Sequence, residues 1–154
     1  MALDYTGVMI VESIQLALAP VFVLVAIGNI LNMLASRHAR VVDRTREMQK
    51  SFLSTTGEDH DASVRELRML ARRTYLISRA QLALVMSAIS IGLCVVAIFS
   101  SQFVHASTEP LVALCFALAI GLLLWGLVLF LMETRVASAQ LRVPLSFLEL
   151  DRDL

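Results

Sequence analysis

Residues whose chemistry could support catalysis or metal binding are scattered along this sequence. The three histidines are His38, His60 and His105, and none stands at metal-ligand spacing from a cysteine or a carboxylate. The two cysteines, Cys94 and Cys115, both lie inside long apolar stretches. There is no phosphate-binding glycine loop and no nucleophile elbow. The sequence therefore predicts no catalytic, cofactor-binding or metal site, and a protein that is not an enzyme.

Polar side chains within the first apolar stretch are better candidates for a functional role. At about 100° per residue of an α-helix, they share one arc of about 100°; its polar members are Gln15, Asn29, Asn32 and Ser36. The middle of the arc is apolar and includes Phe22. Buried amides are costly in a bilayer unless they are paired or hydrated. The arc therefore either forms hydrogen bonds between helices or faces a pore with an apolar constriction at Phe22.

Small residues recur on the second and third apolar stretches. The second stretch carries them at alternating spacings of three and four: Ala80, Ala83, Ser87, Ser90, Cys94, Ala97 and Ser101. The third repeats them every four residues: Ala113, Ala117 and Gly121. Small side chains let helix backbones approach closely within a membrane. This helix-packing seam joins helices either within one chain or between subunits.

The distribution of charge determines the predicted fold. Hydrophobic residues make up 58% of the chain, and residues 13–36, 80–108 and 110–132 contain no Lys, Arg, Asp or Glu. A membrane-crossing helix needs roughly 20 mainly apolar residues. We therefore expect an all-α integral membrane protein, with residues 1–154 forming one membrane domain. Its three transmembrane helices should cover about residues 9–36, 79–104 and 110–133.

Between the first two spans, residues 37–78 should form a helical hairpin that extends both spans beyond the membrane. Apolar residues alternate at spacings of three and four from Ile27 to Phe52, which is typical of a coiled coil. Gly57 is a plausible helix terminator, and Ser63 with Glu66 resembles a capping box that restarts a helix. Residues 143–154 should form a short cytoplasmic tail.

Basic residues are concentrated in the hairpin. Ten of the thirteen Lys and Arg residues lie between Arg37 and Arg79. Because basic residues favour the cytoplasmic side in short loops, the hairpin and the C-terminus should be cytoplasmic and the N-terminus outside. The arginines also suit contact with anionic lipid headgroups. Phe52 and Tyr75 are too sparse an aromatic set for nucleic-acid stacking, so nucleic acid is not expected as a partner.

Three runs of sequence resemble the domain-of-unknown-function 2721 family of small bacterial three-helix membrane proteins. They are Ile14–Phe22, Ala26–Asn32 and Arg37–Arg44. The resemblance implies a bacterial inner-membrane protein and brings no activity with it. It singles out the residues Gln15, Pro20, Asn29, Asn32, Arg40, Asp43 and Arg44. Since Arg40 and Arg44 flank Asp43, a salt-bridged collar next to the membrane is expected there.

Two functional hypotheses remain from the sequence. The first is a homo-oligomeric helical assembly, in its stronger form an ion-conducting pore with the first span nearest the axis. The second is an accessory or structural subunit that packs against a larger membrane complex. The native mass in mild detergent distinguishes them, because a defined homo-multimer favours the first and co-purifying partners favour the second.

Overall fold

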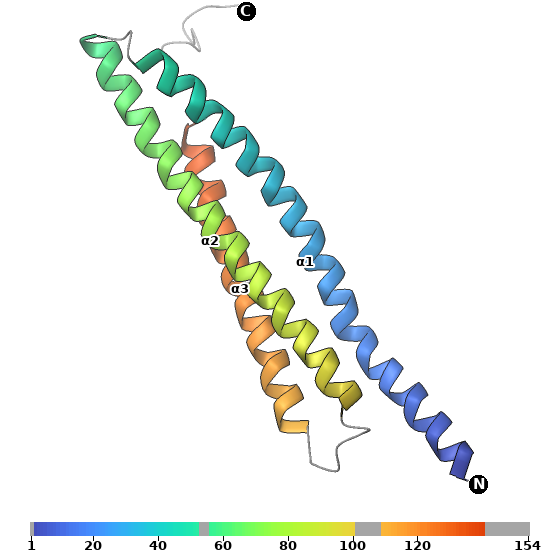
Figure 1. Ribbon diagram of the computed structural model, residues 1–154. Helices are drawn as coiled ribbons and strands as arrows, with labels where there is room; N and C mark the ends of the chain where they lie inside the picture. The colour runs from blue at the N-terminus through green and yellow to red at the C-terminus, as the bar shows by residue number, and fades with distance from the viewer. Residues whose placement is uncertain (1, 53–55, 101–108, 141–154) are drawn as a thin grey trace, which may run out of the picture.

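The computed structural model describes residues 2–52, 56–100 and 109–140, and these fold into three long α-helices (Figure 1). They are α1 (Ala2–Phe52), α2 (Glu58–Ser100) and α3 (Glu109–Gln140). Each contains a stretch that is long and apolar enough to cross a membrane. The prediction of an all-helical chain with three such helices is confirmed. Ser101, the loop to residue 108 and the tail 143–154 lie outside the described residues.

The turn between α1 and α2 is centred on a glycine. Gly57 has a φ of 65°, a left-handed conformation that glycine adopts without steric cost. Its carbonyl accepts from the backbone N–H groups of His60 and Asp61, which closes the first turn of α2. The helix therefore starts at Glu58, and the predicted restart at Ser63 is wrong. Ser63 lies inside α2, where its Oγ donates to the carbonyl of Asp59 over 2.9 Å.

Apolar residues seven apart form the contact between α1 and α2. Ile27, Leu34 and Val41 of α1 are buried. On α2, the buried positions at the same spacing are Leu70, Ile77, Leu84 and Ile91. A seven-residue repeat keeps one seam of a helix facing its partner, as in coiled coils. Because α2 packs against both α1 and α3, it is the central helix of the unit (Figure 1).

The outside of the unit is largely apolar. Phe22 on α1, Val96 on α2 and Leu114 on α3 are 70%, 64% and 67% exposed. Soluble monomers rarely expose continuous apolar surface of this extent. The surface therefore fits a lipid environment better than water.

Candidate functional site

Three charged side chains, one from each helix, meet at the end of the apolar stretch of α3. Glu133 follows the uncharged residues 110–132 and is completely buried. Arg73 of α2 donates to its Oε1 from Nε over 3.1 Å and from Nη2 over 2.9 Å. Arg37 of α1 places its Nη2 3.5 Å from Oε2. We call Arg37, Arg73 and Glu133 the three-helix junction.

The packing of α3 against α2 turns Glu133 inward. Ala119, Gly126 and Glu133 are buried at a spacing of seven, so they share the face of α3 that meets α2. A Cβ on Gly126 would lie 3.0 Å from Cγ of Leu84, so the missing side chain allows a close approach of the two helices. On the α1 side, the guanidinium of Arg37 lies over the ring of Phe130, 5.2 Å from its centroid. This cation–π contact holds Arg37 beside Glu133.

Electrostatics explain why a carboxylate can be buried there. An ionised group withdrawn from water is strongly destabilising unless opposite charges and hydrogen bonds compensate it. Two guanidinium groups face the single carboxylate of Glu133 and supply the opposite charge that its burial requires. Oε2 accepts no hydrogen bond from the described residues, because Arg37 is too distant. Arg73 therefore holds the carboxylate by hydrogen bonds at Oε1, whereas Arg37 compensates the charge at Oε2 across 3.5 Å.

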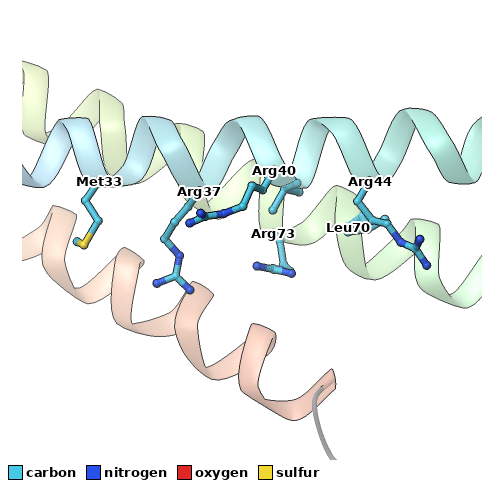
Figure 2. A pocket seen from close by; sticks show the side chains of 7 residues that line it. Met33, Arg37, Arg40, Arg44, Leu70 and Arg73 are labelled. Atoms are coloured by element: carbon cyan, nitrogen blue, oxygen red, sulfur yellow. The ribbon is translucent and has the colours of Figure 1, made fainter.

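A pocket of about 440 Å³ adjoins the junction. Four of its lining residues are arginines, Arg37, Arg40 and Arg44 from α1 and Arg73 from α2. The remaining three are apolar: Met33, Val41 and Leu70. Figure 2 shows Arg37, Arg40 and Arg73 in the space between the ribbons of α1 and α3. We call this the arginine pocket.

The expected collar of Arg40, Asp43 and Arg44 takes a different form. All three residues are exposed. Arg44 pairs with Glu66 of α2 through Nη2 over 2.9 Å, and with Glu47 over 3.5 Å. The hydrogen bond and the negative charge of Glu66 raise the pKa of Arg44. The ion pairs of Arg44 among the described residues thus run to Glu66 on α2 and to Glu47 on α1, and not to Asp43.

The polar arc of α1 faces away from the other helices. Gln15, Phe22, Asn29, Asn32 and Ser36 are all exposed. At about 100° per residue, the centre of this arc lies roughly opposite Ile27 and Leu34, which pack on α2. Ser36 Oγ donates to the carbonyl of Asn32 over 3.2 Å. Within one chain, the arc therefore forms neither an interhelical contact nor the wall of an internal channel along the described helices.

The two halves of the helix-packing seam lie in different environments. On α2, the buried members are Ala80, Ala83, Ser87, Ser90, Cys94 and Ala97, and Ser101 lies outside the described residues. Ser87 Oγ donates to the carbonyl of Ala119 over 2.7 Å, so this half packs on α3. On α3, the predicted small residues Ala113, Ala117 and Gly121 are exposed. The small residues that α3 turns toward α2 are instead Ala119 and Gly126.

Glu133 is not among the candidate site residues that the sequence predicts, and the junction is a finding of the structure. The seven-residue spacing of Ala119, Gly126 and Glu133 is present in the sequence, but Ala113, Ala117 and Gly121 offer a competing set of small residues, so this spacing does not identify the face that meets α2. The partner of Glu133, Arg73, is 60 positions away, and no local pattern connects them. Among the described residues, no three His, Cys, Asp or Glu side chains gather as a metal site requires.

A protein-family model described as "Protein of unknown function (DUF2721)" matches residues 17–143. The chain belongs to the DUF2721 family. The resemblance inferred from the sequence is thereby confirmed over most of its length. In this member of DUF2721, the matched range includes the three-helix junction and the arginine pocket, whereas Gln15 precedes it. No curated protein and no solved structure matches the chain.

Proposed function

We propose that this chain is a non-enzymatic, multi-pass protein of the bacterial inner membrane that forms a homo-oligomer through the outward face of α1. The observation that carries the proposal is the exposure of Asn29 and Asn32 on that face. Both lie in the uncharged stretch 13–36, where lipid offers no hydrogen bonds to an amide. A neighbouring copy would supply those hydrogen bonds or enclose water around them.

A second surface favours helix association as well. Ala113, Ala117 and Gly121 form an exposed stripe of small residues on α3. Such a stripe allows another helix to approach closely within a bilayer. In an oligomer whose α1 arcs meet around one axis, this stripe of α3 offers a second surface for contact between neighbouring copies.

The orientation follows from the basic residues of the hairpin. The arginines near the turn between α1 and α2 place that end of the unit in the cytoplasm by the positive-inside rule. The N-terminus and the α2–α3 connection would then lie outside. In this orientation, the three-helix junction is close to the cytoplasmic membrane surface.

Ion conduction is the stronger form of this proposal. If α1 lies nearest the axis of the oligomer, the arc would have polar ends at Gln15 and Ser36 and an apolar constriction at Phe22. The alternative role is an accessory subunit of a larger membrane complex, in which another protein covers the same face of α1.

Native mass spectrometry in mild detergent, combined with disulfide cross-linking, tests the proposal. Phe22→Cys and Leu118→Cys would be compared in a variant whose Cys94 and Cys115 are replaced by alanine. Phe22 and Leu118 precede Arg37 and Glu133 by equal numbers of residues, so their depths match, and both are exposed. We expect a defined homo-multimer for both variants, and cross-linked dimers for Phe22→Cys only. A monomeric mass without cross-linking would exclude the oligomer, and a different co-purifying protein would favour the accessory subunit.

A further inference from the structure

We propose that the arginine pocket is a binding site for a phosphate-bearing anion. Four guanidinium groups line one pocket, and none of the described residues that line it is acidic. Arginine presents its N–H donors in a planar fork that matches two phosphate oxygens at once. Both the charge and the hydrogen-bonding geometry of the pocket thus suit a phosphate group.

The charge balance around the pocket leaves it positive. Glu133 is shared by Arg37 and Arg73, and Glu66 is engaged by Arg44. Arg40 lines the pocket but takes part in no ion pair recorded among the described residues. Glu133, Glu66 and Glu47 are the carboxylates that pair with the other three arginines, so among the described residues the guanidinium of Arg40 remains to be neutralised by a phosphate anion.

The spacing of the arginines on α1 is consistent with a common target. Positions 37, 40 and 44 are three and four residues apart, so these side chains share one face of the helix. Arg73 joins them from α2, where its hydrogen bonds to Glu133 fix its guanidinium. A site whose side chains are already held in place loses less conformational freedom when a ligand binds.

Size and location indicate which phosphates would fit. A volume of about 440 Å³ falls in the ordinary range of small-molecule pockets. Met33 lies within the uncharged stretch 13–36, while Arg37 is the first charge after it. In a membrane, this level is where the phosphate of a phospholipid lies, with its acyl chains toward Met33. A free phosphate compound from solution offers the same chemistry.

Binding to purified protein in a zwitterionic detergent tests the site. The probes are phosphatidylglycerol, phosphatidylcholine as the lipid without net charge, and inorganic phosphate. The variants are Arg40→Gln and, as a matched control, Arg46→Gln, an exposed arginine of α1 that does not line the pocket. Arg40→Lys separates charge from fork geometry. Circular dichroism confirms that each variant remains helical.

We expect native mass spectra to show phosphatidylglycerol retained at least tenfold better than phosphatidylcholine. Arg40→Gln should weaken retention about fivefold or more, Arg40→Lys should fall between it and the wild type, and Arg46→Gln should change little. If calorimetry shows that inorganic phosphate binds with the same dependence on Arg40, and the lipids do not bind, the ligand is a free phosphate compound and not a lipid headgroup. Equal losses in Arg40→Gln and Arg46→Gln, or no binding of either phosphatidylglycerol or inorganic phosphate, would overturn the site. The same spectra report the subunit number, so failure of the proposed oligomer would be seen separately.

Discussion

Glu133 connects helices that the apolar contacts alone join only in pairs. Hydrophobic residues pack α1 on α2 and α2 on α3, whereas Arg37 and Arg73 reach the same carboxylate from two different helices. Replacing a buried ion pair with apolar residues is often harmless, but removing one member leaves an uncompensated charge. At this position, the loss would place two positive charges side by side without their shared counterion.

Neutralising Glu133 should therefore destabilise the protein. We expect Glu133→Gln to cost about 3 kcal/mol, since Arg37 and Arg73 would repel each other across a neutral amide. Thermal unfolding in detergent, followed by circular dichroism, measures the effect. Glu109→Gln is the control, because Glu109 is exposed at the start of α3. Equal melting temperatures for both variants would mean that the junction contributes no stability.

The apolar repeats made the helices and one of their contact faces predictable from the sequence. Every predicted stripe residue of α1 from Ile27 to Phe52 is buried or half-buried, and the small residues of α2 do face a partner helix. The corresponding face of α3 could not be predicted, because α3 is apolar almost all the way round. A helix without an amphipathic pattern offers two sets of small residues, and only packing selects Ala119 and Gly126 over Ala117 and Gly121.

Two glycines of α3 test this selection of faces. A methyl group at Gly126 would press on the buried Leu84, whereas one at Gly121 would meet no atom within 4 Å. Both substitutions gain similar helix propensity, so their difference isolates packing. We expect Gly126→Ala to be less stable than Gly121→Ala by about 1–2 kcal/mol. Thermal unfolding of the two variants in one detergent measures this difference. If Gly121→Ala were the less stable variant, the face of α3 that carries Gly121 would be the one that packs on α2.

The arrangement of the whole molecule depends on contacts between distant parts of the chain. Hydropathy was enough to predict three long helices, because the uncharged stretches are unambiguous. The arginine pocket was not predictable, since its residues come from α1 and α2 and meet only when the hairpin closes. Local spacing favoured a collar around Asp43, whereas the hairpin brings Glu66 to Arg44. Local spacing can indicate a pair such as Arg44–Glu47, but the pairs that Glu133 and Glu66 form among the described residues join different helices and cannot be seen in it.

The proposed membrane orientation rests on the same charge distribution and can be measured directly. Single cysteines at Thr56, Ser107 and Ser146 would be introduced in a variant without Cys94 and Cys115. With the basic hairpin in the cytoplasm, an impermeant thiol reagent added to intact cells should label only the cysteine at position 107. Permeabilised cells provide the control, in which all three positions should react. Labelling of position 56 in intact cells would reverse the orientation.

The outward face of α1 allows the proposed pore to be tested in the assembled oligomer. If copies of the α1 arc surround a closed pore, Phe22 is its apolar barrier, and a polar side chain there should admit water. Phe22→Ser should then increase ion flux from reconstituted liposomes several-fold above the wild type. Leu118→Ser is the control, because it has a similar depth and exposure on α3 but lies away from the arc.

Measuring the mass of the assembly beside the flux separates a pore from a plain contact surface. Phe22 is 70% exposed in the single chain, so its truncation leaves no cavity within the subunit. In a packed interface, the same change removes contact area between copies and should weaken the multimer without raising the flux. In a pore, the multimer should persist while the flux increases. Background flux together with a weakened multimer would therefore contradict the pore and support the oligomer. A polar residue at this depth can increase ion flux only if the axis of the oligomer contains water.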